Sequence, residues 1–134
     1  MITADTSVLV AAFGGWHGRN AQALNALAAV SVLSGHVALE FVSVMTRMPP
    51  PRRTPPQLAA QFLTDHFSSP KLTLGSDGYD ALVRLAVERG IIGGAIYDAL
   101  VALTAKEAGM TLLTLDERAA STYHATGVEY QLLS

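Results

Sequence analysis

The fold is decided by the stretch Met110-Thr111-Leu112-Leu113-Thr114-Leu115-Asp116-Glu117, an apolar, β-favouring run that ends at an acid. A short apolar run followed at once by helix-start residues predicts a strand that leads directly into a helix. Thr114 and Glu117 have the spacing of a capping box, which predicts a helix from there to His124. Strands that alternate with helices favour parallel pairing, so the pattern indicates an α/β sandwich.

The same strand-to-acid pattern occurs near the start of the sequence. Residues 2–4 predict a strand that stops at Asp5, and Thr6 or Ser7 can cap the helix that follows. Three further strands are expected at residues 36–39, 71–74 and 128–133. Helices are expected at residues 8–13, 17–33, 57–67, 76–90 and 95–108, and another is expected to begin at Glu40. No linker or repeat suggests a second domain, so residues 1–134 are interpreted as a single domain.

The composition excludes several classes of protein. Half of the 134 residues are hydrophobic, 15% are charged and none is cysteine, so disulfide scaffolds, cysteine zinc sites and thiol nucleophiles are excluded. The net charge of −2 argues against general nucleic-acid binding, but not against a nuclease whose bound divalent ions reverse the sign of an acidic pocket. With no signal peptide and no apolar stretch that could span a bilayer, we expect a cytoplasmic protein with no membrane contact.

Four of the eleven acids stand where a solvated surface acid would be unusual. Asp5, Glu40 and Asp116 each follow an expected strand, and ligands of parallel α/β sheets gather beyond the carboxyl ends of the strands. Asp98 lies within an expected helix. Its neighbours on that helix are small or apolar: Gly94, Ala95, Val101, Ala102 and Ala105. A carboxylate in such a stripe is costly to bury unless it is paired or binds a metal.

Each of these acids also has a purely structural interpretation. Asp5 can cap a helix, and Glu40 can be a favourable acid at a helix start. Asp116 stands beside the capping box, which makes the structural interpretation strong there. Asp98 can pair with an arginine, but its small neighbours leave open space beside the carboxylate, so function is favoured at this position.

The four acids together indicate metal chemistry. Carboxylates that converge without a cation would raise one another's pKa and cost stability. Oxygen ligands without nitrogen or sulfur suit Mg²⁺ or Mn²⁺, which hold phosphate oxygens and activate water. The four histidines lie far apart without zinc-ligand spacing, and the sequence has no Walker loop, dinucleotide fingerprint or nucleophile elbow. Phosphodiester hydrolysis is the reaction that fits.

The sequence around these acids resembles the PIN-domain proteins. The first acid lies in Ile2-Thr3-Ala4-Asp5-Thr6-Ser7-Val8-Leu9-Val10 and the second in Leu39-Glu40-Phe41. The third lies in Gly94-Ala95-Ile96-Tyr97-Asp98-Ala99-Leu100-Val101-Ala102 and the fourth in Leu112-Leu113-Thr114-Leu115-Asp116-Glu117-Arg118. The four motifs occur in order along essentially the whole chain. The length of the chain and the residues of its four motifs resemble those of VapC, the toxin of VapBC toxin–antitoxin pairs.

This resemblance implies a PIN-type α/β/α sandwich with a central, mainly parallel sheet. It implies an endoribonuclease that depends on Mg²⁺ or Mn²⁺ and forms a homodimer, with RNA as substrate and a VapB-like antitoxin as inhibitor. Asp5, Glu40, Asp98 and Asp116 would be its catalytic and metal-binding residues. Thr6 and Thr114 would orient carboxylates or water. Some relatives carry a further acid after the fourth, where this chain has Arg118 and Ala119, so a second metal would bind weakly or only with substrate.

Two surfaces are expected to bind partners. Arg52 and Arg53, in the loop after the triple proline, are expected to contact RNA phosphates, although a solvated loop is the competing interpretation. The region from Val10 to Leu33 is expected to form an antitoxin groove or the homodimer face. Two other functions are considered, a catalytically inactive PIN-fold RNA-binding or regulatory module and a receiver-type phosphoacceptor domain. The receiver type is disfavoured, because Asp5 has no acidic neighbour.

Overall fold

The computed structural model describes residues 1–133 and builds them around a three-stranded parallel sheet. The strands are β1 (Ile2–Ala4), β2 (Thr111–Thr114) and β3 (Tyr130–Leu132), and they lie in the order β1-β2-β3. Ile2 is paired with Thr111, and Leu112 is paired with Tyr130. The predicted α/β fold with a parallel sheet is confirmed.

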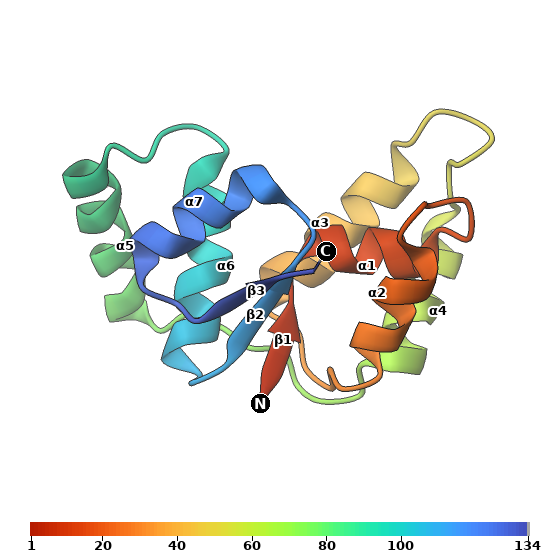
Figure 1. The fold of residues 1–134 in the computed structure, drawn as a ribbon, viewed down its shortest axis with the longest axis horizontal. Coiled ribbons are helices and arrows are strands. Elements are labelled where there is room, and N and C mark those ends of the chain that lie inside the picture. The colour runs from red at the N-terminus through yellow and green to blue at the C-terminus, as the bar shows by residue number, and fades with distance from the viewer. Residues whose placement is uncertain (134) are drawn as a thin grey trace.

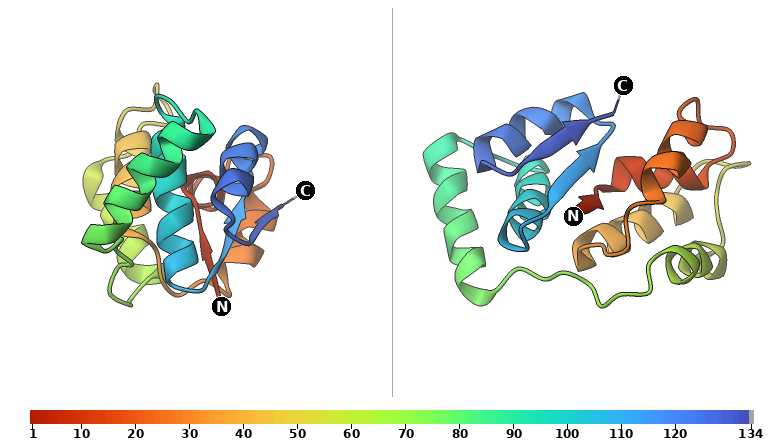
Figure 2. Two further views of the ribbon diagram at one scale, coloured as in Figure 1. Left: turned by 90° about the vertical axis from the view of Figure 1, so that its left-hand side faces the viewer. Right: turned by 60° about the horizontal axis from the view of Figure 1, so that its bottom comes forward.

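Seven helices surround the sheet in this part of the chain. They are α1 (Thr6–Phe13), α2 (Asn20–Leu27), α3 (Gly35–Thr46), α4 (Pro56–His66), α5 (Ser76–Arg89), α6 (Ala95–Glu107) and α7 (Glu117–Thr126). Figure 1 shows the sheet between two groups of helices, with α5, α6 and α7 on one side and α1 and α2 on the other. The right-hand view in Figure 2 shows the same division. The C-terminal strand thus returns beside β2 after α7 has crossed back over the sheet.

Burial of apolar side chains on both faces holds the sheet between these helices. Leu112 and Leu113 in β2 are both buried, as expected for a parallel strand covered on two sides. Phe13, Phe41 and Phe62 pack edge-on or tilted with ring centroids 5.2–5.7 Å apart, and they join α1, α3 and α4. A smaller apolar cluster, Leu82, Ile91 and Ala99, joins α5 to α6.

Two predicted strands are wrong. Residues 36–39 lie in the first turns of α3, because the Ser34 hydroxyl accepts the N–H of Val37 at 3.1 Å and starts the helix there. A short apolar run fits a buried helix as well as a strand, and the serine cap decides between the two. Residues 71–74 form only an isolated parallel bridge, between Leu72 and Ser34.

The helix predicted over residues 17–33 is shorter than expected. It is α2, which ends at Leu27, and the following segment runs past β1 without joining the strand ladder. The Thr3 hydroxyl donates to the carbonyl of Val32 at 2.8 Å, and Val30 and Val32 are buried. The β-branched residues of this segment therefore pack along the sheet edge instead of continuing the helix.

Other boundaries agree with the sequence to within a few residues. The helix predicted over residues 95–108 is α6, and the strand predicted over residues 128–133 is the shorter β3. Gly90 and Gly127 end α5 and α7 with φ of 67° and 78°, in the left-handed region that glycine adopts without strain. Among residues 1–133, no helix combines the length and the apolar character needed to cross a membrane.

Candidate active site

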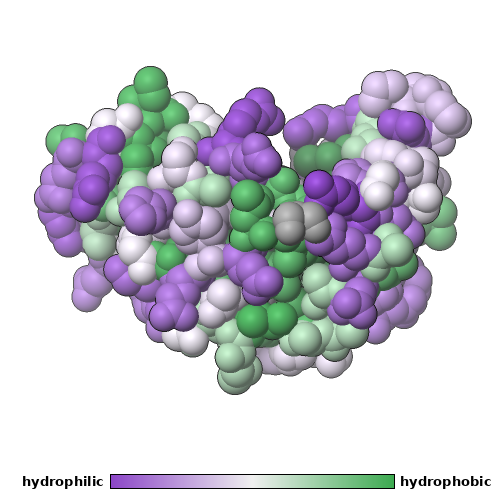
Figure 3. All heavy atoms as spheres, in the orientation of Figure 1, coloured by the Kyte–Doolittle hydropathy of each residue, from purple (hydrophilic) through white to green (hydrophobic). Residues whose placement is uncertain are grey.

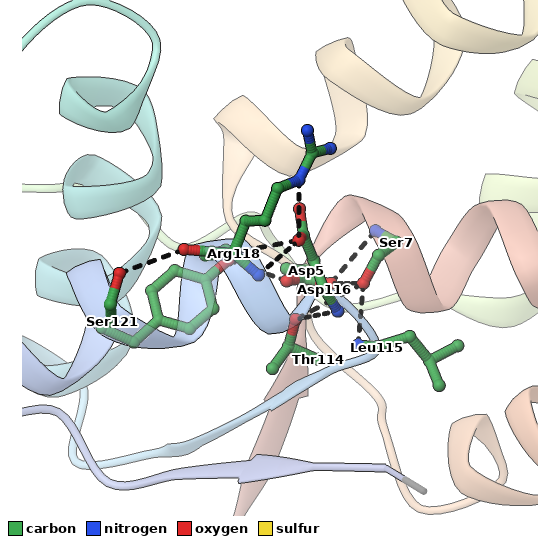
Figure 4. A network of polar contacts seen from close by, with 9 residues as sticks. Asp5, Ser7, Thr114, Leu115, Asp116, Arg118 and Ser121 are labelled. Carbon is green, nitrogen blue, oxygen red and sulfur yellow. Dashed lines mark hydrogen bonds and ion pairs between the residues drawn. The ribbon is translucent and has the colours of Figure 1, made fainter.

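A pocket of about 790 Å³ opens where β1 and β2 end, at the carboxyl edge of the sheet. Its walls come from α1, α3, α6 and α7 as well as from the strand ends. Figure 4 shows Asp5 and Asp116 close together in one network of polar contacts at this place. The structure brings all four acids singled out in the sequence to the pocket: Asp5, Glu40, Asp98 and Asp116.

The four acids reach the pocket from two strand ends and two helices. Asp5 directly follows β1, and Asp116 follows β2 after one intervening residue. Asp98 lies in the first turn of α6. Glu40 lies inside α3, so the prediction that it follows a strand and opens a helix is wrong. The helix still carries it to the pocket, because α3 packs against α1.

Asp5 is held from both sides. Its Oδ1 accepts the backbone N–H groups of Ser7 at 3.0 Å and Val8 at 3.4 Å, which makes Asp5 the N-cap of α1. Its Oδ2 accepts the hydroxyl of Tyr123 at 2.7 Å. The prediction that Thr6 or Ser7 caps this helix is therefore wrong, since the aspartate one residue earlier already satisfies the free N–H groups.

Asp116 repeats this geometry at the next strand. Its Oδ1 accepts the N–H groups of Arg118 at 2.9 Å and Ala119 at 3.3 Å, so it caps α7. The predicted capping box of Thr114 and Glu117 does not form, because Thr114 still belongs to β2. The Thr114 hydroxyl instead accepts the N–H of Asp116 at 3.0 Å and fixes the turn that leads to the cap.

Hydroxyl groups connect the acids to the strand ends. The Ser7 hydroxyl donates to Oδ1 of Asp5 and accepts the N–H of Leu115 at 2.9 Å, which ties the start of α1 to the end of β2. The Thr6 hydroxyl donates to Oε1 of Glu40. Thr6 and Ser7 thus each orient one carboxylate, that of Glu40 and that of Asp5.

A stacked ring pair lies beside Glu40. His36 and Tyr97 stack with centroids 5.5 Å apart and planes 3° from parallel. His36 is one turn before Glu40 in α3, and its Nε2 lies 3.9 Å from Oε2 of that residue. Tyr97 directly precedes Asp98 in α6. The stack therefore joins α3 and α6 next to the two acids that these helices supply.

The carboxylates act on one another's ionisation. Burial raises the pKa of Asp5 despite its hydrogen bonds to Ser7, Tyr123 and the N–H of Val8. Burial and the nearby charges of Asp116, Glu40 and Asp5 together raise the pKa of Asp98 to about 6. Burial and the charge of Asp5 also raise the pKa of Tyr123, so its hydroxyl remains a neutral donor.

The donor set suits a hard divalent cation. Carboxylate oxygens are the preferred ligands of Mg²⁺ and Mn²⁺, and a cation would offset the repulsion that raises the pKa of Asp98. As the side chains are placed, no three acids or histidines within the described residues are close enough together to hold a metal ion.

Several pocket residues were not singled out by the sequence. Tyr123 gives no local signal, because its partner Asp5 lies 118 residues away. Three arginines also line the pocket: Arg19, Arg47 and Arg118. Arg52 and Arg53 do not line it. Arg52 stacks on Trp16 with its guanidinium carbon 4.0 Å from the ring centroid, and Arg53 donates to the carbonyl of Met48, so their contact with RNA stays a prediction.

We predict that Asp98→Asn stabilises the metal-free protein at neutral pH by about 1 kcal/mol, a value discounted for the partial exposure of the side chain. A raised pKa means that the charged form is disfavoured in the folded state, so the wild type loses stability as pH rises from 3.8 to about 6. The extra stability of Asp98→Asn should vanish as the pH falls to the acid end of this range. Thermal denaturation in EDTA, from that pH up to neutral pH, measures the difference in stability between variant and wild type, with the exposed Asp80→Asn as matched control. A lower melting temperature at neutral pH would identify Asp98 as a structural ion-pair member.

We predict that Tyr123→Phe lowers the free energy of unfolding by about 1–2 kcal/mol, because the buried Asp5 carboxylate loses a hydrogen bond and keeps its desolvation penalty. Urea titration measures this change, with Tyr79→Phe at an exposed position of α5 as control. Equal stability of the two variants would mean that the hydroxyl does not hold the carboxylate.

Comparison with known proteins identifies the family. A PIN domain family model matches residues 2–125. Ribonuclease VapC40 of Mycobacterium tuberculosis is 46% identical over 134 residues, which cover both chains completely. Ribonuclease VapC27 of the same species is 45% identical over 98 residues, 73% of this chain and 71% of that protein.

Two solved structures share the fold at low sequence identity. FitAB bound to an IR36 DNA fragment has a TM-score of 0.73 at 19% identity, covering 98% of this chain and 94% of that chain. FitAcB from Neisseria gonorrhoeae has a TM-score of 0.70 at 21% identity, covering 97% and 96%. The resemblance noted in the sequence and the PIN-type fold are thus confirmed. The chain belongs to the PIN domain family, among the VapC-type ribonucleases.

Proposed function

We propose that this protein is a divalent-metal-dependent endoribonuclease that acts in the cytoplasm as the toxin of a toxin–antitoxin pair. The observation that carries the proposal is the pocket in which carboxylates from β1, α3, α6 and the end of β2 converge. Full-length similarity to Ribonuclease VapC40 supports RNA as the substrate. Hydrolysis of a phosphodiester bond is the reaction that such a pocket favours.

Asp5, Glu40, Asp98 and Asp116 would hold Mg²⁺ or Mn²⁺. Such a cation, when bound, offsets phosphate charge and lowers the pKa of water. The chain's own contribution is orientation. Asp5 cannot rotate freely, because the α1 cap and Tyr123 fix both of its oxygens. The α7 cap holds Oδ1 of Asp116, and the Thr6 hydroxyl orients Glu40.

The charge of the Asp98 carboxyl depends on pH. With its pKa raised to about 6 by burial and by the charges of neighbouring acids, the Asp98 carboxyl loses its proton around pH 6. A bound cation would favour the ionised form, so metal affinity should rise with pH in this range. The inactive PIN-fold alternative is not favoured, because the chain has an acid in each of the four motifs and all four line one pocket.

Two protein partners belong to this proposal, a second copy of the chain and a VapB-like antitoxin. Large apolar side chains are exposed along α5 and just after it: Tyr79, Val83, Val87 and Ile92. The region from Val10 to Leu33, where a partner groove was expected, exposes Trp16 and Leu24. We therefore favour the α5 surface for the homodimer, which leaves the α1–α2 side for the antitoxin. An antitoxin arginine could pair with the pocket carboxylates and compete with the metal.

We predict that the protein cleaves RNA with Mg²⁺ or Mn²⁺ and that EDTA abolishes the cleavage. Asp98→Asn and Asp116→Asn should each reduce the rate by about a hundredfold or more, because both remove a metal-binding charge. Asp80→Asn on α5 is the matched control and should cleave normally. Gel analysis of end-labelled RNA measures the rates. Undiminished cleavage in the chelator would exclude the metal mechanism, and no cleavage under any condition would favour the inactive module.

We predict that expression of the protein alone slows bacterial growth and that co-expression of a small upstream-encoded partner restores it. Replacing the partner's pocket-binding arginine should release ribonuclease activity even when the complex stays assembled, because the competing guanidinium is gone. Growth curves and size-exclusion chromatography measure the two effects. Full inhibition by every such arginine variant would show that the antitoxin blocks the site sterically.

A further inference from the structure

Two aromatic side chains connect the two groups of helices beside the pocket. Helix α3 packs mainly against α1 and α4, whereas α6 packs mainly against α5 and α7. Figure 3 shows hydrophilic side chains on both sides of a notch at the upper edge of the molecule, between α7 and the helices of the opposite group. Glu40 and Asp98 therefore reach the pocket from helices that belong to different groups. The stacked rings of His36 and Tyr97 join these two helices.

The stack fixes the plane of the His36 ring. Its two rings are 3° from parallel with centroids 5.5 Å apart, which is a favourable arrangement for an aromatic pair. Facing rings do not donate hydrogen bonds to each other, since the N–H groups of an imidazole point outward in the ring plane. Tyr97 therefore holds the imidazole by its face, and the edge of that ring can serve another partner.

The edge of the His36 ring carries a buried nitrogen that is not paired. Among residues 1–133, Nε2 of His36 is a buried side-chain polar atom with no hydrogen-bond partner. It lies 3.9 Å from Oε2 of Glu40, one helical turn further along α3. A buried donor without a partner costs stability, so its retention requires an explanation other than stability. The separation exceeds that of an ordinary hydrogen bond by only about 1 Å, so a small movement of Glu40 would bring its carboxylate within reach of Nε2.

A bond from His36 would hold the Glu40 carboxylate at both oxygens. The Thr6 hydroxyl already donates to Oε1 of Glu40. Asp5 is held in this way in the same pocket, because the N–H of Ser7 donates to one of its oxygens and the hydroxyl of Tyr123 donates to the other. Carboxylates that bind metals are themselves commonly hydrogen-bonded, and the loss of such an outer partner weakens metal binding or activity by about ten- to a hundredfold.

We propose that His36 and Tyr97 are positioning residues of the carboxylate site. Tyr97 holds the imidazole by stacking, and the N–H at Nε2 of His36 donates to Oε2 of Glu40 and orients this carboxylate for cation binding. The inference rests on the proposed metal-dependent function and adds two residues to the site that it describes. Both residues act through Glu40 rather than on the cation itself.

Calorimetric titration of the protein with MnCl₂ tests the donor. His36→Phe keeps an aromatic ring against Tyr97 and removes the N–H, so the affinity for Mn²⁺ should fall by about tenfold. Its melting temperature without metal should be equal or higher, because a buried nitrogen without a partner has been removed. His36→Gln supplies an amide N–H in place of the imidazole N–H and should recover part of the lost affinity. A lower melting temperature with unchanged affinity in His36→Phe would show a purely structural role and overturn the proposal.

Variants of Tyr97 test the stack in the same titration. Tyr97→Ala removes the ring that holds the imidazole and should also weaken Mn²⁺ binding, whereas Tyr97→Phe keeps the ring and should restore the affinity. Tyr79→Ala is the matched control, since Tyr79 and Tyr97 are 51% and 57% exposed. In a Glu40→Gln background, His36→Phe and Tyr97→Ala should cause no further loss, because both act through Glu40. Losses that add to that of Glu40→Gln would contradict this route of action.

Long-range ¹H–¹⁵N correlation spectra of the metal-free wild type give a readout that needs neither cation nor RNA. They identify which imidazole nitrogen carries the proton. Nε2 of His36 should carry it, because only a protonated Nε2 can donate to Oε2 of Glu40. A proton on Nδ1 alone would overturn the proposal, and this result decides the question even if the variants fail to fold.

The outcomes separate this inference from the proposed function. Normal Mn²⁺ affinity in His36→Phe, together with metal-dependent RNA cleavage by the wild type, would overturn the positioning role and leave the ribonuclease function standing. Weakened Mn²⁺ binding in His36→Phe, together with a wild type that cleaves no RNA with any divalent metal, would refute the ribonuclease function and support the positioning role. A wild type that binds no divalent cation would overturn both.

Discussion

Two aspartate caps determine how the sheet, the helices and the pocket fit together. Asp5 and Asp116 each follow a parallel strand and each bind the free N–H groups of the next helix through Oδ1. Because β1 and β2 are neighbours, the two caps place two carboxylates side by side at one edge of the sheet. The helix dipole and the hydrogen bonds favour the ionised form of Asp5, while burial opposes it. Burial has the larger effect, since the pKa of Asp5 is raised.

The strand-to-acid pattern predicted this arrangement well, because it is local. A β-favouring run, an acid and a helix start lie within about eight residues of each other, and both copies fold as the sequence indicated. The capping residues were misassigned because threonine, serine and aspartate all cap helices, so the residue that does so depends on where the strand ends. Residues 36–39 were misassigned for a related reason. Their apolar run suits either structure, and the Ser34 cap is the local signal that distinguishes the helix from a strand.

The remainder of the site depends on contacts between distant parts of the chain. The sequence marked four acids by their type and position, and it assigned Glu40 to the pocket for a wrong reason. Tyr123 and Arg19 gave no pattern, because periodicity shows which side chains face the core but not which distant group each will meet. Arg52 and Arg53 were chosen because they lie just after the helix expected to begin at Glu40, yet the arginines that line the pocket lie on other elements.

The bond between Tyr123 and Asp5 also gives the protein an order of assembly during translation. Asp5 is synthesised long before the hydroxyl that fixes its carboxylate, which lies 118 residues later. β1 must likewise wait for Thr111–Thr114 before it can pair. Since a chain folds progressively as it leaves the ribosome, neither cap can meet its neighbour until α7 has emerged. The complete carboxylate site therefore cannot form on an early nascent chain, and a ribosome making this ribonuclease carries an unassembled site for most of the synthesis.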